Sequence, residues 1–365
     1  MDPHTQFCPN SACPARGHVG RGNITIHSQR EQRYRCTLCG RTFSARRGTP
    51  FYRKQYPEAL ITQVVTLVAH GCPEAAVVAA FALHPRTVRE WITAAGQHCE
   101  TVQQHLVEQP RDLGQVQADE LRVQTQAGVV WMAMAMQVAT RLWLGGVLSP
   151  TRDQALIRQI ADLIARCALV APLLVMVDGL VSYVAAVRRA CRTRQARPGQ
   201  RPARVPWPEL VIGQVIKHTV QRRLVAVTRR VVVGRAVLAT DLVATTQGHG
   251  GLNTSYIERL NATFRSRLAR LGRRTRHGAR QQQRLHAAMY LVGTVYNFCS
   301  YHASLVLSQE WPQPRTPAMA AGLAQYRWSV DELLHYQVPP ARWRPPKQRG
   351  RRSKELQQLI ECWAA

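Results

Sequence analysis

Alternating and continuous apolar stretches recur through the middle of the chain, and amphipathic stretches separate some of them. The run VAPLLVMV ends at Asp178, and a continuous apolar run closed by a turn is typical of a strand buried on both faces of a parallel sheet. Helical periodicity at 151–168 predicts the helix that precedes this strand. Five other stretches have strand-like patterns: residues 114–124, 129–139, 141–149, 209–220 and 224–234. Three consecutive strands followed by strand–helix units predict an α/β fold with a mixed sheet.

Residues 253–276 predict a helix with three different faces. Its apolar stripe, with spacings of three and four, consists of Ile257, Leu260, Phe264, Leu268 and Leu271. Glu258, Asn261 and Arg265 align beside this stripe. The stretch from Arg259 to position 284 contains nine arginines and no acid. One carboxylate at the edge of the core among so many cations favours a metal ligand that faces a polyanion. The alternative is an amphipathic helix with a solvated basic face.

Two aspartates upstream provide the other ligands for such a metal site. Asp178 follows its strand directly, and ligands in open α/β sheets bind at the carboxyl ends of the strands. Asp119 lies in the stretch GQVQADELRVQ and shares a face with Leu121 and Val123, so an inward orientation is expected. Its neighbour Glu120 lies on the opposite face and is the alternative ligand.

Two pairs of closely spaced cysteines near the amino-terminal end predict a structural zinc site. Cys8 and Cys13 form C-x4-C, and Cys36 and Cys39 form C-x2-C. Each pair can supply two thiolates from a tight turn, and the metal then replaces the hydrophobic core that a short segment lacks. Disulfides are the alternative. The lack of a signal peptide and the scattered positions of the other six cysteines disfavour them.

Residues 57–95 predict three helices. The first spans 57–69, the second begins at Pro73, and a short turn leads to a third helix at 85–95. This spacing is typical of a helix-turn-helix, whose second helix places polar residues near its amino-terminal end against base edges. Here these polar residues are Arg86, Thr87 and Arg89. Any small three-helix bundle has a similar pattern and is the alternative.

The charge of the chain predicts a polyanionic partner. The formal net charge is +28 over 365 residues and the pI is near 11.0, so nucleic acid is the simplest partner. Of the 49 basic residues, 45 are arginine, whose guanidinium group suits bidentate contact with phosphate. Genomic base composition is the alternative explanation for the arginine bias.

Two segments have the composition of irregular chain. Residues 192–208 are rich in Arg and Pro and predict a mobile loop with affinity for phosphate. After Glu310 the chain is rich in Pro; one short helix is expected within RWSVDELLHYQVP, and RWRPPKQRGRR predicts a solvated basic tail. The longest apolar run, residues 167–177, has 11 residues and is too short to cross a membrane. A cytoplasmic, nucleoid-associated protein is therefore expected.

The combination of cysteine pairs, helix-turn-helix and three acids resembles bacterial insertion-sequence transposases of the DDE superfamily, whose catalytic core has the ribonuclease H-like fold. The resemblance extends from about Cys8 to about His302 and is most specific in CxxCGRTFS, VDG and YIERLNATFRSR. It implies four parts: a zinc ribbon at 1–52, a helix-turn-helix domain at 53–110, a catalytic domain at 111–310 with a basic insertion at 192–208, and a Pro-rich basic tail at 311–365.

The resemblance also implies the chemistry. In this family the first acid lies on the first strand, the second just after the fourth, and the third on a later helix; here these are Asp119, Asp178 and Glu258. They would bind Mg²⁺ or Mn²⁺ for cleavage of DNA at the element ends and strand transfer into target DNA. A homo-oligomer on double-stranded DNA is expected. The residues expected to contact DNA are Arg86, Thr87, Arg89, Arg259, Asn261, Arg265, Arg273 and Arg274.

Two other functions are compatible with the sequence. A DNA-binding regulator would keep the zinc ribbon and the helix-turn-helix without catalysis, and the three acids argue against it. A ribonuclease H-like nuclease would cut DNA without joining it, and its active site would have the same residues. The sequence does not separate cutting from joining.

Overall fold

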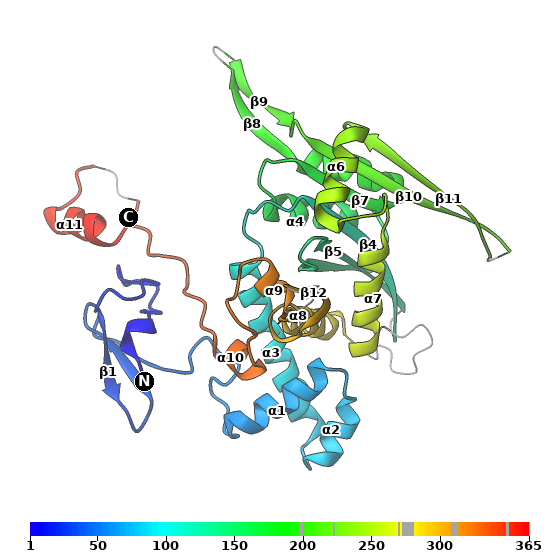
Figure 1. Cartoon of the computed structure of the whole chain (residues 1–365). Helices are drawn as coiled ribbons and strands as arrows, with labels where there is room; N and C mark the ends of the chain where they lie inside the picture. The colour runs from blue at the N-terminus through cyan, green and yellow to red at the C-terminus, as the bar shows by residue number, and fades with distance from the viewer. Residues whose placement is uncertain are drawn as a thin grey trace. The chain divides into compact units, whose positions relative to one another are not determined.

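The computed structural model describes residues 1–126, 128–197, 200–221, 223–268, 271, 281–307, 312–347 and 350–364 (Figure 1). The chain divides into two compact units. The first combines both ends of the chain, Met1–Glu58 and His335–Ala365, and the second is Ala59–Leu334. The segments predicted as helix-turn-helix and as catalytic domain lie in the same second unit, whereas most of the predicted tail lies with the cysteine-rich segment.

A six-stranded mixed sheet forms the centre of the second unit, as the apolar patterns predict. Its strands are β4 (Gln115–Thr125), β5 (Gly128–Gln137), β6 (Trp143–Ser149), β7 (Leu173–Asp178), β10 (Leu210–Val220) and β11 (Arg223–Val233). Their order is β11-β10-β7-β4-β5-β6. The pairs β4–β5, β5–β6 and β10–β11 are antiparallel, while β7 is parallel to both β4 and β10. The continuous apolar run of β7 is buried because this strand is central in the sheet.

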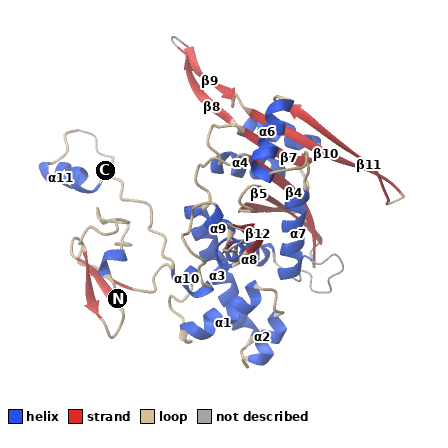
Figure 2. Cartoon of the chain, viewed as in Figure 1, coloured by secondary structure: helices blue, strands red, loops and turns tan. Residues whose placement is uncertain are grey.

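Helices accompany this sheet (Figure 2). They are α4 (Gln154–Cys167), α5 (Val181–Ala190), α6 (Ala236–Gln247), α7 (Ser255–Arg267) and α8 (Gln282–Cys299). The Asp153 side chain caps α4 by accepting a hydrogen bond from the Leu156 backbone N–H. The predicted apolar stripe of the helix at 253–276 is buried, but α7 ends at Arg267. Its C-cap, Leu268, has extended backbone angles, so the helix is shorter than the sequence predicts.

Three helices at the start of the second unit occupy the positions that the sequence predicts. They are α1 (Glu58–Ala69), α2 (Glu74–Ala80) and α3 (Pro85–Leu106). The helix α3 is longer than expected, and its second half packs against α8. Gly96 permits this packing, because a Cβ there would collide with the carbonyl oxygen of Ala287. The other elements of this part are β12 (His302–Val306), β13 (Pro314–Arg315), α9 (Pro317–Ala320) and the expected short helix α10 (Val330–His335).

The segment 192–208 is a β-hairpin and not the irregular loop that its composition predicts. Its strands are β8 (Arg192–Arg197) and β9 (Gln200–Pro206), paired antiparallel. Its base is anchored by the buried residues Cys191 and Trp207, joined by a hydrogen bond from the Trp207 N–H to the Cys191 carbonyl oxygen. The expectation fails because alternate backbone N–H groups in a two-stranded ribbon point away from the partner strand. Proline has no N–H and is tolerated at those positions.

The first unit contains the short helix η1 (Pro3–Thr5), the antiparallel sheet β1 (Ile24–Ser28), β2 (Arg33–Cys36) and β3 (Thr42–Ser44), and the carboxyl-terminal helix α11 (Lys354–Trp363). Within this unit the end of the chain packs against the sheet. Gln337 donates hydrogen bonds of 2.7 Å to the carbonyl oxygens of Ala45 and Arg47. The Trp363 ring lies edge-on to His18. The basic segment RWRPPKQRGRR, residues 342–352, is mostly exposed where the structure describes it, as predicted for a solvated tail, and the helix α11 beyond it packs through Trp363. No helix among the described residues is long and apolar enough to cross a membrane.

Candidate metal centres

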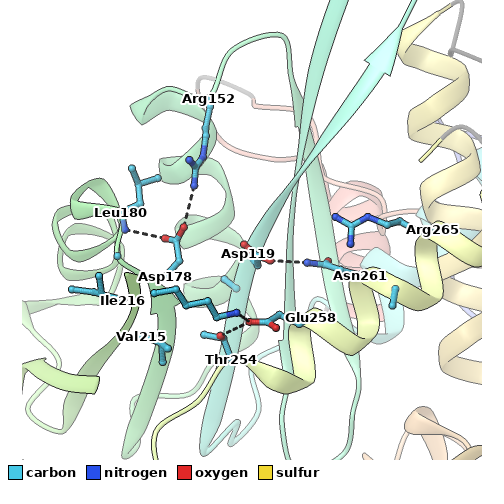
Figure 3. Close-up of a pocket in the computed structure, with 14 residues that line it drawn as sticks. Asp119, Arg152, Asp178, Leu180, Val215, Ile216, Thr254, Glu258, Asn261 and Arg265 are labelled. Atoms are coloured by element: carbon cyan, nitrogen blue, oxygen red, sulfur yellow. Dashed lines mark hydrogen bonds and ion pairs between the residues drawn. The ribbon is translucent and has the colours of Figure 1, made fainter. Parts of the chain in front are cut away.

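Parallel pairing brings two aspartates to the same row of the sheet. Gln117 of β4 pairs with Met176 of β7, and two residues further along each strand lie Asp119 and Asp178. Asp178 also pairs with Val215 of β10. Both aspartates line one open pocket, together with Glu258 from α7 (Figure 3). Three elements that are distant in sequence therefore each place one acid in the same pocket.

Both oxygens of the Asp119 carboxyl group accept hydrogen bonds. Oδ1 accepts from the Glu120 backbone N–H at 2.9 Å, and Oδ2 accepts from Asn261 Nδ2 at 2.7 Å. Burial raises the pKa of Asp119 to about 7, and the charges of Glu120, Asp178 and Glu258 add to the rise. An acid so crowded by other acids is better suited to binding a cation than to remaining ionised alone.

Asp178 is held by the turn that follows its strand. Its Oδ1 accepts a hydrogen bond of 3.0 Å from the Leu180 backbone N–H, and its Oδ2 accepts one of 3.1 Å from Arg152. The same Arg152 guanidinium forms an ion pair of 2.8 Å with Glu120, whose side chain is completely buried. Arg152 thereby neutralises part of the acidic cluster.

Glu120, the alternative to Asp119, is close to the same site. Asp119, Glu120 and Asp178 each offer a carboxylate oxygen, and these oxygens lie within 4.8 Å of one another. Glu120 nevertheless does not line the pocket and is paired with Arg152, whereas Asp119 lines it. The pocket therefore presents Asp119 and Asp178 to a ligand, with Glu120 behind them.

Glu258 lies in the first turn of α7 and also lines the pocket, but one lysine and one threonine of the protein hold its carboxylate. Lys217 of β10 forms an ion pair of 2.6 Å with Glu258 Oε1, and the Thr254 hydroxyl donates to the same oxygen at 2.8 Å. Its carboxylate is outside the group of three acids that lie within 4.8 Å of one another. The structure thus brings the predicted third acid into the pocket without placing it against the two aspartates.

The residues expected to bind DNA along α7 have different positions. Asn261 is 2% exposed, lines the pocket and donates a hydrogen bond from its amide to Asp119, so it positions that acid. Arg265 lines the pocket, and Arg259 is exposed. Arg273 and Arg274 lie outside the described residues.

The polar residues at the start of α3 lie near its surface. Arg86 is exposed and forms an ion pair of 2.8 Å with Glu90, one helical turn further along. Arg89 donates a hydrogen bond of 2.8 Å to the Pro85 carbonyl oxygen, and Thr87 is half-buried. An exposed ion pair of this kind contributes only about 0.3–0.5 kcal/mol, so a phosphate group can replace Glu90 at little cost.

The four amino-terminal cysteines converge within the first unit. Their sulfur atoms lie within 4.8 Å of one another. Cys8 Sγ is 3.7 Å from Cys39 Sγ, and Cys13 Sγ is 3.9 Å from Cys36 Sγ. Four sulfurs at about 2.3 Å from a tetrahedral zinc ion would be about 3.8 Å apart. The spacing therefore fits a metal of this size.

Burial also supports a ligand at the cysteines. It raises the pKa of Cys13 to about 12 and that of Cys8 further, with additional repulsion from Cys36. Such thiols stay protonated unless a cation replaces their protons. The turn between β2 and β3 closes with a hydrogen bond from the Gly40 N–H to the Cys36 carbonyl oxygen, and Gly40 has a φ of 69°. Glycine adopts this left-handed conformation without strain.

Two residues of the acidic site were not predicted from the sequence. Arg152 lies in a short loop before α4, and no pattern marks it. Lys217 had a recognisable signal, because it is one of only four lysines in the chain and follows the apolar run LVIGQVI. No family model matches the sequence and no curated protein matches it, so the functional assignment depends on the geometry of these sites.

Proposed function

We propose that this chain is a DNA transposase of the DDE type, which binds the ends of a mobile element and catalyses metal-dependent cleavage and strand transfer. One observation carries the proposal. Asp119, Asp178 and Glu258 come from β4, the end of β7 and α7, and all three line one pocket. These are the positions of the three acids in ribonuclease H-like transposases, and the mixed sheet is compatible with that fold.

The residues of the pocket fit Mg²⁺ or Mn²⁺. Both aspartates offer hard oxygen ligands, and each carboxylate is oriented by a backbone or amide N–H, as metal ligands commonly are. Bound divalent cations would activate a water molecule or a DNA 3′-hydroxyl and stabilise the leaving oxygen. Glu258 would complete the ligand set once Lys217 releases it, because the ammonium group now supplies the positive charge beside that carboxylate.

The other groups of the pocket would act on the phosphodiester. Arg265 and Lys217 line the pocket and offer positive charge to a phosphate. Asn261 keeps Asp119 in position, and Arg152 holds Glu120 and Asp178 together. Each protein group thus binds or orients, and the reaction is in-line substitution at phosphorus without a covalent intermediate on the protein.

The cysteine cluster is proposed to hold one structural Zn²⁺. The tetrahedral spacing of Cys8, Cys13, Cys36 and Cys39 supports this metal, and the donor set of four thiolates is typical of zinc. The basic surface and the three helices α1–α3 would bind the double-stranded DNA of the element ends, and a homo-oligomer on that DNA is proposed.

The experiment that tests the function uses the DNA that flanks the coding region as the substrate. Asp119→Asn, Asp178→Asn and Glu258→Gln should each reduce cleavage by orders of magnitude and leave end binding largely intact, since binding depends mainly on the cationic surface. Asp162→Asn is the matched control, because Asp162 is an exposed acid on α4 outside the pocket. Cleavage by the triple variant at the wild-type rate would overturn the proposal.

The same assay separates the alternatives. A regulator would bind the end DNA without cleaving it, and a nuclease would cleave it without joining the new 3′-end to a plasmid. The acids in the pocket disfavour the regulator, because a protein that only binds DNA gains nothing from placing carboxylates beside a phosphate. Strand transfer into a supercoiled plasmid, in the presence of Mg²⁺, supports the transposase over the nuclease.

A further inference from the structure

The outer halves of β10 and β11 extend beyond the sheet. Pairing of β10 with β7 runs from Leu210 to Val215, and beyond that point β10 pairs with β11. Figure 1 shows the two strands running out past the sheet. Residues 216–221 and 223–228 are called the β10–β11 arm below. Nearly all of its side chains are exposed. A long exposed two-stranded ribbon invites association with a partner.

The root of this arm is a wall of the acidic pocket. Val215, Ile216 and Lys217 line the pocket, and Val215 pairs with Asp178. Residues two apart on a strand share a face, so Lys217 lies on the same face as Asp178. Arg229 of β11 pairs with Val215 and belongs to this face as well. A phosphodiester in the pocket therefore has its neighbouring nucleotides along the arm.

The charge of the arm fits a polyanion. From Leu210 to Val233 the sequence has no Asp or Glu, and Lys217, Arg223 and Arg229 are exposed. This composition disfavours a second copy of the chain as the partner, because that copy carries the same formal net charge of +28. A duplex of nucleic acid, by contrast, offers phosphates on both sides of a groove that admits a two-stranded ribbon.

Exposed apolar side chains lie next to the turn of the arm, whereas the described residues of the turn itself, Gln221 and Arg223, are polar. Val220, Leu224 and Val225 are 59%, 57% and 59% exposed. Phosphate contacts do not need such side chains, and water solvates them poorly. Apolar side chains inserted between base pairs unstack and kink a duplex. Apolar side chains beside the turn of a cationic ribbon therefore have the composition of a wedge.

We propose that the β10–β11 arm lies in a groove of the DNA whose phosphodiester occupies the pocket, and that the apolar residues beside its tip, Val220, Leu224 and Val225, part the base pairs near the cleavage point. This inference rests on the proposed function. Three residue pairs separate Lys217 from the tip, a distance of roughly 10 Å at about 3.3 Å per residue. That distance equals roughly three nucleotides of one strand. The tip therefore acts on the third or fourth base pair from the scissile phosphate.

The experiment places 2-aminopurine at successive positions of an end duplex and measures its fluorescence on binding, without Mg²⁺ so that cleavage does not interfere. Wild-type protein should raise the fluorescence most at the third or fourth position. The double variant Leu224→Ser, Val225→Ser should lose most of this rise and still bind the duplex within about threefold of wild type, since the arginines remain. The matched control is Val237→Ser, because Val237 is 73% exposed and lies on the helix α6, outside the arm.

A second measurement tests the same step by rescue. With Mg²⁺, the double variant should cleave a paired duplex about tenfold more slowly than wild type. A tenfold loss corresponds to about 1.4 kcal/mol of unstacking free energy that the variant no longer supplies. A mismatch at the third or fourth position supplies that unstacking and should restore its rate. A variant that merely misfolds would not recover on mismatched DNA.

Each outcome decides the inference. Equal fluorescence from variant and wild type, or no rescue by the mismatch, would overturn the wedge. If the double variant has a different oligomeric state from wild type without DNA, and the 2-aminopurine fluorescence is unchanged, the arm joins two copies of the chain instead. Failure of the proposed function gives a different result, because wild-type protein would then cleave neither the paired nor the mismatched duplex.

Discussion

At the scale of single residues, the predicted aspartates could be read from strand position, whereas their supports could not. Asp178 ends an apolar strand, and that signal is visible in the sequence. The hydrogen bond from Asn261 to Asp119 depends on where α7 crosses the sheet, which no local pattern encodes. The sequence predicts that Asn261 contacts DNA; in the structure it lines the pocket, and its buried amide bonds to Asp119.

The pKa of Asp119 predicts how stability depends on pH. Because its folded pKa is about 7 and its ordinary value is 3.8, folding favours the protonated form. The ionised carboxyl group costs no stability below pH 3.8, an increasing amount as pH rises, and the full amount above pH 7. The amide of the Asp119→Asn variant does not titrate. Without added Mg²⁺ this variant should exceed wild type in stability at pH 8 by up to about 4 kcal/mol, and the difference should vanish towards pH 4.

The measurement is thermal unfolding of both proteins across this pH range, in chelator-free buffer so that the zinc proposed at the four cysteines is retained. Asn261 Oδ1 is buried without a hydrogen-bond partner, so a flip of the Asn261 amide can accommodate the amide that replaces the Asp119 carboxyl group. Asp162→Asn is the control and should show no such trend, since Asp162 is exposed. A constant difference at all pH values would contradict the raised pKa of Asp119, which burial and the neighbouring acids cause.

Asn261 itself provides a second prediction. Replacing it with alanine removes the N–H that orients Asp119, so the Mg²⁺ concentration for half-maximal cleavage should rise by about 10–100-fold. End-DNA affinity should be largely unchanged, because the Asn261 amide is 2% exposed and its N–H is already donated to Asp119. Titration of cleavage against Mg²⁺ checks the first statement, and a gel-shift assay checks the second. Weaker DNA binding with an unchanged Mg²⁺ requirement would show that Asn261 contacts the DNA after all.

At the scale of elements, the strands of the six-stranded sheet followed from alternating and continuous apolar runs, whereas the buried helix α8 was not predicted. Helix α8 is buried on nearly all sides between Leu285 and Cys299. A helix that is apolar all round has no amphipathic period, so its sequence carries none of the signal that marks α4. The hairpin β8–β9 was missed for the opposite reason. Its Arg- and Pro-rich composition is typical of a loop, and the pairing of two arginines is unfavourable in isolation.

The faces of the β8–β9 hairpin predict its contribution to DNA binding. Arg194 pairs with Arg204, and Arg192 lies two residues away on the same face. All three are exposed, and none forms an ion pair with an acid among the described residues. Like charges directly opposite each other destabilise a hairpin unless an anion lies between them. The logarithm of the DNA-binding constant falls linearly with the logarithm of the salt concentration. Replacing all three arginines by glutamine should reduce the steepness of this slope by about 2–3, one phosphate contact for each arginine.

The control for this slope is the pair Arg158→Gln, Arg166→Gln on α4. Arg158 donates to Gln154, and Arg166 is paired with Glu108, so neither should contribute a phosphate contact. Fluorescence anisotropy with labelled end DNA, at several salt concentrations, gives the slope. If the hairpin variant keeps the wild-type slope and the α4 variant loses it, the phosphate contacts lie on the other surface.

At the scale of the whole molecule, the two chain ends belong to one compact unit, which no local reading of the sequence could anticipate. The formal net charge of +28 predicts a polyanionic partner without knowledge of the fold, because it is a sum over all residues. The packing of the carboxyl-terminal segment depends instead on contacts more than 300 residues apart in sequence, such as the hydrogen bond between His18 and the Trp363 carbonyl oxygen. Such contacts leave only weak local signals, here a tryptophan at the end of a short helix that also carries Leu356, Leu359 and Ile360.

The stability of this unit gives the last prediction. Trp363 packs against the cluster that contains Cys8, Cys13 and Cys36, and its ring contacts His18 edge-on. Trp363→Ala should therefore let a chelator remove the metal several-fold faster, because local opening of the unit exposes the thiolates. Glu361→Ala, an exposed change on the same helix, should not. Cys36→Ser should abolish metal binding altogether, since it removes a ligand. Metal release followed with a chromogenic chelator tests all three in the full chain; equal release from Trp363→Ala and wild type would mean that the helix α11 does not stabilise the cysteine cluster.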